Sequence, residues 1–107
     1  LKEVFGAFEI PAAVAIAADA DVFDAYVTLG CVIRGETTHY DYVCGESARG
    51  LMDLSVQRRL PIGYGILTVE NQEQAWVRAD RKQKNKGADA ATAAISMHAY
   101  RKEILRG

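Results

Sequence analysis

Apolar residues along the chain form short continuous runs that are separated by longer stretches of helical spacing. Two near-continuous apolar runs, at 23–29 and 62–68, are typical of strands that are buried on both faces of a sheet. Residues 2–5 are also interpreted as a short strand, near the start of the chain. The apolar pattern therefore predicts three strands with other elements between them.

Helices are expected between and after these strands. Pro11 suits the first turn of a helix, and alanine-rich residues follow it. Residues 38–59 and 88–105 carry apolar side chains at helical spacing, while Asn71 and Gln74 have the spacing of a capping box at a helix start. The predicted apolar faces consist of Tyr40, Val43, Ser47, Ala48, Leu51, Met52, Ser55 and Val56 in the longer helix, and of Ala91, Ala94, Ile95, His98 and Ala99 in the last one.

The alternation of strands and helices predicts an α/β fold in which helices cover both faces of a parallel sheet. Residues 1–107 are expected to form a single domain, because a chain of this length encloses one modest core. Three strands make an unusually thin sheet for this class. We therefore expect that the N-terminal part of the domain is absent from this sequence.

Composition and charge exclude several classes of function. Half of the residues are hydrophobic and a quarter are charged, as in ordinary globular proteins, and a net charge of −1 gives no electrostatic case for nucleic-acid binding. The sequence contains no membrane-length apolar run and no export signal, so neither a membrane nor a nucleic acid is an expected partner. Cys31 and Cys44 lack metal-ligand spacing and are expected to be reduced core thiols, which makes the cytoplasm the expected location.

The segment 30–39 carries the clearest chemistry. A strand ends near Gly30, a polar loop with glycine and hydroxyl side chains follows, and His39 stands where a helical pattern begins. Unpaired N–H groups and the helix dipole make such a loop a natural anion site. Histidine is the side chain best suited to proton transfer near neutral pH. Phosphate binding beside a proton shuttle is the chemistry that this segment predicts.

Four blocks of sequence closely resemble the lumazine synthase family, the penultimate enzymes of riboflavin biosynthesis. The blocks are Gly6-Ala7-Phe8-Glu9-Ile10-Pro11, Leu29-Gly30-Cys31-Val32-Ile33-Arg34-Gly35-Glu36-Thr37-Thr38-His39-Tyr40, Gly65-Ile66-Leu67-Thr68 and Asn85-Lys86-Gly87. They occur in the expected order and spacing over essentially the whole chain. The resemblance implies a flavodoxin-like three-layer α/β/α sandwich on a four-stranded parallel sheet. It also implies a homopentamer, sometimes a decamer or a shell of sixty subunits, and a strand and helix ahead of Gly6.

The resemblance implies a reaction between two small molecules without a metal or an organic cofactor. Lumazine synthases condense 5-amino-6-(D-ribitylamino)uracil with 3,4-dihydroxy-2-butanone 4-phosphate, and they release phosphate and water to give 6,7-dimethyl-8-ribityllumazine. His39 matches the family's catalytic histidine. Glu36, Thr37, Arg78 and Lys86 match positions on the phosphate side of the site. The pyrimidine and its ribityl chain are expected against Ala7, Phe8, Glu9, Cys31, Val32, Ile33 and Tyr64.

The resemblance also implies that each site is shared, because Tyr64 and Arg78 would come from the neighbouring subunit. The chain departs from the family pattern at 80–84, where Asp-Arg-Lys-Gln-Lys replaces a glycine-containing segment, so substrate affinity is the property most open to change. The family's aromatic residue that stacks on the pyrimidine has no counterpart here. Arg34 is equally compatible with a substrate contact and with an ion pair that shapes the loop, and Trp76, Met97 and His98 are expected to pack within or between subunits.

Three readings remain open from the sequence. The chain could belong to an active lumazine synthase, to a non-catalytic assembly or flavin-binding protein on the same scaffold, or be a fragment that cannot fold alone. The presence of His39, Arg78 and Lys86 favours the enzyme.

Overall fold

The computed structural model describes residues 1–106. A 3-10 helix, η1 (Ala7–Glu9), precedes α1 (Ile10–Asp19), and two strands and three helices follow along the described chain. They are β1 (Tyr26–Ile33), α2 (His39–Gln57), β2 (Ile62–Val69), α3 (Gln72–Ala79) and α4 (Lys86–Arg106).

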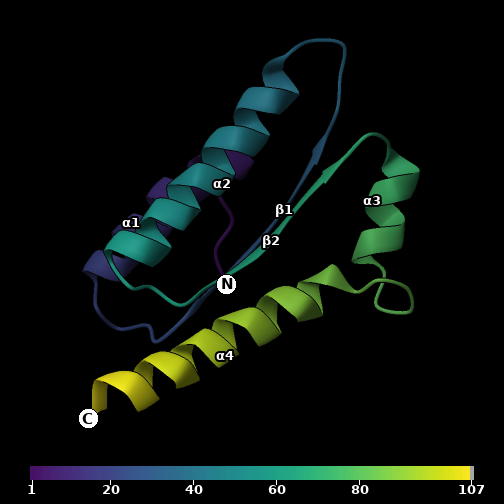
Figure 1. Cartoon of the computed structure of the whole chain (residues 1–107). Helices are drawn as coiled ribbons and strands as arrows, with labels where there is room; N and C mark the ends of the chain where they lie inside the picture. The colour runs from purple at the N-terminus through teal and green to yellow at the C-terminus, as the bar shows by residue number, and fades with distance from the viewer. Residues whose placement is uncertain (107) are drawn as a thin grey trace.

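The two strands pair in parallel between two layers of helices. The register runs from Tyr26 opposite Ile62 to Ile33 opposite Val69. Helices α1 and α2 lie on one side of the strands, and α3 and α4 lie on the other (Figure 1). The predicted α/β class, with helices on both faces of a parallel sheet, is confirmed.

The prediction of a strand at 2–5 is wrong. These residues are irregular and exposed, and the sheet of the described residues contains only β1 and β2. A strand this short forms only when a neighbouring strand accepts its backbone hydrogen bonds, and residues 2–4 line a cavity with β1 but do not pair with it.

Local sequence signals placed most helix starts correctly. Pro11 lies in the first turn of α1, and the Asn71 side chain accepts a hydrogen bond of 2.8 Å from the N–H of Gln74 at the start of α3. Helix α4 begins at Lys86, two residues before the predicted start, directly after Asn85 in the left-handed backbone region (φ 46°). Asparagine tolerates this conformation well, so the turn before α4 is a favourable one.

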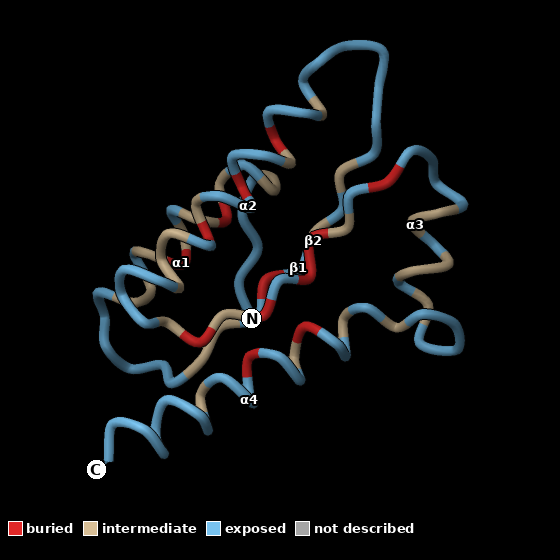
Figure 2. Tube along the Cα trace, in the orientation of Figure 1, coloured by how far each residue is buried: buried red, intermediate tan, exposed pale blue. Residues whose placement is uncertain are grey.

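The main core lies between the sheet and the α1–α2 layer. Ile10, Val14, Leu51 and Ile66 form its buried cluster, and Figure 2 shows buried positions of α2 on the side that faces the strands. Strand β1 is not buried on both faces, contrary to the prediction, because Thr28 is buried while Val27 and Leu29 on either side are exposed. The strand also begins at Tyr26 rather than at residue 23. The Phe23 ring instead stands edge-on to that of Tyr26, 6.1 Å away.

Several side chains predicted to be buried are exposed in this chain. Met52 and Val56 of α2, Ile95 of α4 and Trp76 of α3 are largely exposed, Trp76 to 67%, while Met97 of α4 is half exposed although it lines a cavity. The buried positions of α2 are Val43, Ser47 and Leu51, spaced four residues apart. Packing within the described chain therefore does not account for Trp76 and accounts for Met97 only in part, and packing of either residue between subunits stays a prediction.

Candidate active site

The β1–α2 connection presents His39 at a helix start, as the sequence predicts. The Thr37 hydroxyl accepts a hydrogen bond of 3.3 Å from the N–H of His39, and the Thr38 carbonyl accepts from Asp41 at 3.0 Å. Glu36, Thr37 and His39 are exposed. The loop thus delivers first-turn N–H groups and a histidine ring to the surface at the carboxyl end of a strand, where ligands of α/β sheets bind.

Arg34 forms ion pairs beside this loop. Its Nε lies 2.7 Å from Glu70 Oε2, and its Nη2 lies 3.4 Å from Asp41 Oδ1. Its guanidinium carbon is 4.4 Å from the centre of the Tyr40 ring. Desolvation lowers the pKa of Arg34, but Glu70 and Asp41 outweigh it and raise the pKa above its ordinary value. Of the two roles open from the sequence, the ion-pair role is the one that this geometry supports.

Residues predicted to contact the pyrimidine lie around η1 and the end of β1. Ala7 and Cys31 line one cavity of about 480 Å³, together with Gly30 and the first residues of the chain. Phe8 is more than half exposed, Glu9 is half-buried, and Val32 and Ile33 continue β1 beyond this cavity. The structure therefore gathers part of the predicted pyrimidine set at one edge of β1.

Cys31 is exposed, so the prediction of a core thiol is wrong at this position, whereas Cys44 is half-buried. Partial burial still raises the pKa of the Cys31 thiol above its ordinary value. Both thiols are free.

A second cavity, of about 520 Å³, brings together Tyr64 of β2, Arg78 of α3 and Lys86 of α4. The Lys86 ammonium lies 3.4 Å from Asp89, and Arg78 donates a hydrogen bond of 3.1 Å to the carbonyl of Gln74. Asp89 lines the same cavity and offsets one of the two cations, which leaves one net positive charge, on Arg78, suited to an anionic substrate group. Three predicted residues from three separate elements thus meet at one place.

The predicted residues therefore fall into two groups on one chain. His39, Glu36 and Thr37 lie on the β1–α2 connection, and neither they nor Ala7 and Cys31 line the cavity that holds Tyr64, Arg78 and Lys86. The residue pattern alone does not record this separation, but the separation agrees with the shared site that the family resemblance implies.

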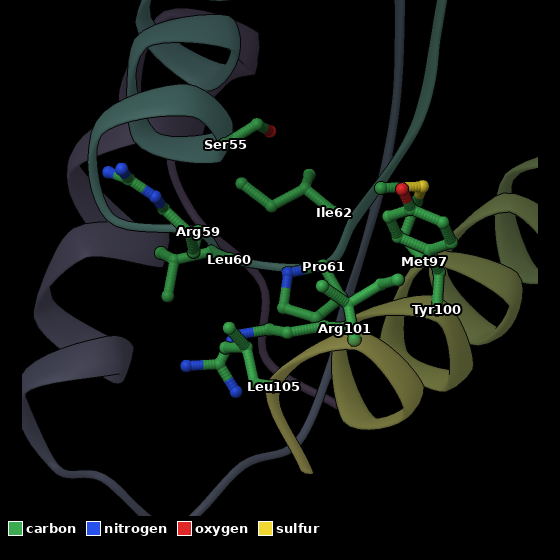
Figure 3. A pocket seen from close by; sticks show the side chains of 10 residues that line it. Ser55, Arg59, Leu60, Pro61, Ile62, Met97, Tyr100, Arg101 and Leu105 are labelled. Carbon is green, nitrogen blue, oxygen red and sulfur yellow. The ribbon is translucent and has the colours of Figure 1, made fainter. Parts of the chain in front are cut away.

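A third cavity was missed by the sequence analysis. It measures about 240 Å³ and lies between the end of α2, the start of β2 and the second half of α4. Figure 3 shows Met97 and Tyr100 of α4 facing Pro61 and Ile62 across it. Its lining is largely apolar and holds no residue of the predicted site. The only sequence signal for it is the apolar composition of the segments that meet there.

Metal and membrane chemistry receive no support from residues 1–106. No group of three or more His, Cys, Asp or Glu residues in this part of the chain is placed to bind a metal ion. None of its helices has the length and apolarity needed to cross a membrane. The cytoplasmic location expected from the sequence stays a prediction.

Comparison with known proteins assigns the chain to a family. Residues 1–102 match the family model described as 6,7-dimethyl-8-ribityllumazine synthase. The chain belongs to this family. The relatives include proteins named 6,7-dimethyl-8-ribityllumazine synthase from Methylobacterium radiotolerans, 62% identical over 91% of this chain, and from Bartonella tribocorum, 59% identical over 92%. A third, from Afipia carboxidovorans, is 55% identical over 99%.

The chain spans 59% of the length of the Methylobacterium relative, 66% of the Bartonella one and 68% of the Afipia one. The family resemblance stated from the sequence is thus confirmed. The roles of individual site residues stay predictions.

Proposed function

We propose that the complete protein is a 6,7-dimethyl-8-ribityllumazine synthase of riboflavin biosynthesis. The observation that carries the proposal is the match of residues 1–102 to that family, together with relatives that include one 62% identical. The reaction condenses 5-amino-6-(D-ribitylamino)uracil with 3,4-dihydroxy-2-butanone 4-phosphate and releases phosphate and water. Positioning the two substrates can supply several kcal/mol of the rate enhancement by itself.

His39 is the proposed acid–base group. Imine formation, phosphate elimination and ring closure all move protons, and a histidine at an exposed helix start can both accept and donate them near neutral pH. Glu36 and Thr37 flank it on a loop whose N–H groups can bind phosphate oxygens.

Arg78, Lys86 and Tyr64 form the second half of the proposed site. Arg78 offers a planar fork for a phosphate and Lys86 a point charge, while the Tyr64 ring offers an aromatic surface. Because their cavity excludes His39, Glu36 and Thr37, we propose that the two halves meet between neighbouring subunits of a homo-oligomer, such as a ring of five. A head-to-tail interface repeated around a ring brings unlike surfaces of one chain together in this way.

The pyrimidine and ribityl chain are assigned to the remaining predicted residues. Cys31, Val32 and Ile33 offer backbone groups at the end of β1. The Glu9 carboxylate offers an acceptor for ribityl hydroxyls from η1, and each such bond contributes about 1.5–3 kcal/mol. Ala7 and Phe8 complete this surface.

The complete purified protein tests the proposal when it is incubated with both substrates. We expect 6,7-dimethyl-8-ribityllumazine and phosphate to form in equal amounts. Chromatography with mass spectrometry detects the first product and a phosphate assay the second. When one substrate is omitted, the protein should not accelerate the formation of either product. A well-folded protein that binds the pyrimidine or a flavin without turnover would contradict the proposal and favour the non-catalytic alternative.

Mixing two inactive variants tests the shared site. His39→Ala and Arg78→Ala subunits that are unfolded and reassembled together would form some interfaces with an intact His39 on one side and an intact Arg78 on the other. We expect activity to return in the mixture and not in either variant alone. A mixture as inactive as its components would show that the two residues serve the same site from one chain.

A further inference from the structure

Arg34 holds together the three segments that meet at the carboxyl end of the sheet. It follows β1, it pairs with Asp41 in the first turn of α2 at 3.4 Å, and it pairs with Glu70 directly after β2 at 2.7 Å. Its guanidinium group also lies over the ring of Tyr40, the neighbour of His39. We name Arg34, Tyr40, Asp41 and Glu70 the arginine clasp.

The clasp continues through hydrogen bonds toward α3. The N–H of Arg34 donates to the Val69 carbonyl at 2.9 Å, and the N–H of Glu70 donates to the Gln74 side chain at 2.8 Å. The Gln74 carbonyl in turn accepts from Arg78 at 3.1 Å. One connected set of contacts therefore runs from the turn that carries His39 to the helix that carries Arg78.

Apart from the hydrogen bonds of the first turn of α2, the loop that leads to His39 has few contacts in the described structure. Residues 34–39 are all exposed, and a methyl group added at Gly35 would meet no atom within 4 Å. Proton transfer requires the imidazole to lie within hydrogen-bond reach of the reacting group, and a shift of about 1 Å can cost about 100-fold in rate. The contacts of Tyr40 and Asp41 with Arg34 thus bear directly on where His39 stands.

We propose that Arg34 is a positioning residue, which sets the place of the His39 turn through the arginine clasp and does not itself bind the phosphate. This inference rests on the proposed lumazine synthase function. The charge of Arg34 is directed at two carboxylates, which leaves no unbalanced cation for a substrate anion. Exposed ion pairs contribute little to stability, so the clasp is expected to act on geometry more than on unfolding.

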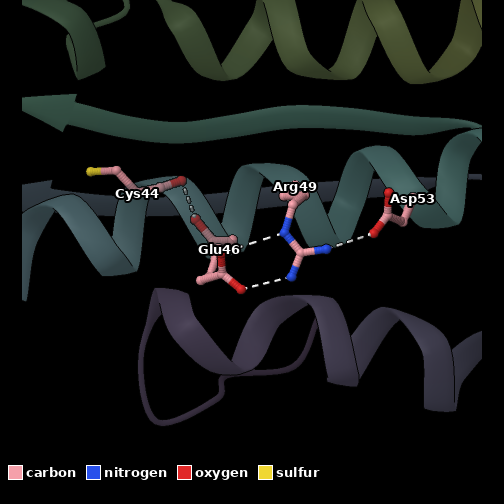
Figure 4. Close-up of polar contacts among 5 residues, drawn as sticks. Cys44, Glu46, Arg49 and Asp53 are labelled. Carbon is pink, nitrogen blue, oxygen red and sulfur yellow. Dashed lines mark hydrogen bonds and ion pairs between the residues drawn. The ribbon is translucent and has the colours of Figure 1, made fainter.

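The experiment compares Arg34→Gln, Arg34→Lys and Glu70→Gln in the complete protein. Arg49→Gln is the matched control, because Arg49 also pairs with two carboxylates, Glu46 at 2.7 Å and Asp53 at 3.1 Å, but within α2 alone (Figure 4). We expect Arg34→Gln to lower kcat by about 10- to 100-fold while KM for both substrates changes less than about twofold. Arg34→Lys should recover part of kcat, since lysine keeps the charge but not the fork. Arg49→Gln should match the wild type.

A double variant separates coupled from independent effects. If Arg34 and Glu70 act as one unit, Arg34→Gln with Glu70→Gln should have about the same kcat as Arg34→Gln alone. If the losses in kcat of the two single variants multiplied in the double variant, the proposal would be overturned. A rise in KM for the phosphorylated ketone with kcat unchanged would also overturn it and would make Arg34 a substrate contact.

Amide hydrogen exchange tests the clasp without activity. We expect residues 36–42 to exchange faster in Arg34→Gln than in the wild type and in Arg49→Gln, with the midpoint of thermal unfolding nearly unchanged. Unchanged exchange in this segment would overturn the proposal. If the wild type formed no lumazine, the proposed function would fail while hydrogen exchange still decided whether the clasp holds the turn.

Discussion

The backbone of Gly63 on β2 lies directly against the carbonyl group of Ala90 on α4. A methyl group on Gly63 would overlap that carbonyl, and a backbone group cannot rotate aside as a side chain can. Two residues on, a methyl group on Gly65 would come within 2.6 Å of the Thr28 carbonyl oxygen. The close approach of Gly63 to Ala90 lets α4 pack tightly against β2. It thereby places Lys86, at the start of α4, beside the same cavity as Tyr64.

Gly63→Ala is expected to lower the free energy of unfolding by about 1–3 kcal/mol or more, because the added methyl group would overlap the Ala90 carbonyl, a main-chain group. Gly45→Ala is the matched control: Gly45 lies within α2, and a methyl group there would meet nothing within 4 Å. That variant should gain about 0.5–1 kcal/mol from helix propensity. Chemical denaturation measures both, and equal stability of the two variants would contradict the packing described for Gly63.

His39→Ala should lower kcat by about 10- to 10⁴-fold, because an acid–base group contributes on this scale while substrate positioning survives. Steady-state kinetics and a separate measurement of pyrimidine binding check this, and affinity for the pyrimidine should change little. His98→Ala serves as a control, since His98 lies on α4 outside the predicted site. Unchanged turnover in His39→Ala would remove this residue from the mechanism.

Arg78→Ala should weaken binding of the phosphorylated ketone far more than binding of the pyrimidine. Arg78→Lys should restore only part of the loss, because lysine cannot form two parallel hydrogen bonds with a phosphate. The exposed Arg81 three residues on provides the control variant Arg81→Ala. Calorimetric titration with each substrate distinguishes the cases, and equal weakening of both would indicate a structural role for Arg78.

Glu46 is expected to contribute a pH-dependent part of the stability. Its hydrogen bond and ion pair with Arg49 lower the pKa of Glu46 below its ordinary value of 4.5. A lowered pKa stabilises the folded state above the unfolded-state pKa, and this contribution is lost as pH falls through the folded-state pKa.

Thermal unfolding of Glu46→Gln across a pH series tests this linkage. The variant should melt slightly below the wild type at neutral pH, and the difference should vanish at a pH well below 4.5. Glu73→Gln, which changes an exposed glutamate that has no ion pair among residues 1–106, should show no such trend. A difference for Glu46→Gln that is the same at every pH would argue against the ion pair as its cause.

Local signals allowed much of the fold to be predicted. The Asn71 cap depends only on residues three apart, and Pro11 acts within its own turn, so both signals survive whatever packs around them. The long β2 strand was also placed to within one residue, since its apolar run is bounded by Pro61 and by polar residues after Val69.

Features that depend on distant partners could not be predicted from the sequence. Residues 2–5 were predicted to be a strand but do not pair with β1, and Ile95 has helical spacing but lies on an uncovered face of α4. The division of the candidate site is different, because the family resemblance implied it although the residue pattern alone did not. Whether His39 and Arg78 serve one cavity is decided by the path of the chain through three layers, which no spacing in the sequence records.

Trp76 is the only tryptophan of the chain, and it stands largely in solvent on α3. Unfolding of this chain is therefore expected to change the Trp76 fluorescence only moderately, since two thirds of the residue is already exposed to water. Contact of another subunit with α3 would instead bury the ring and shift its emission to shorter wavelength. The emission wavelength of Trp76 is thus expected to report association of subunits through α3. No added label is needed for this measurement.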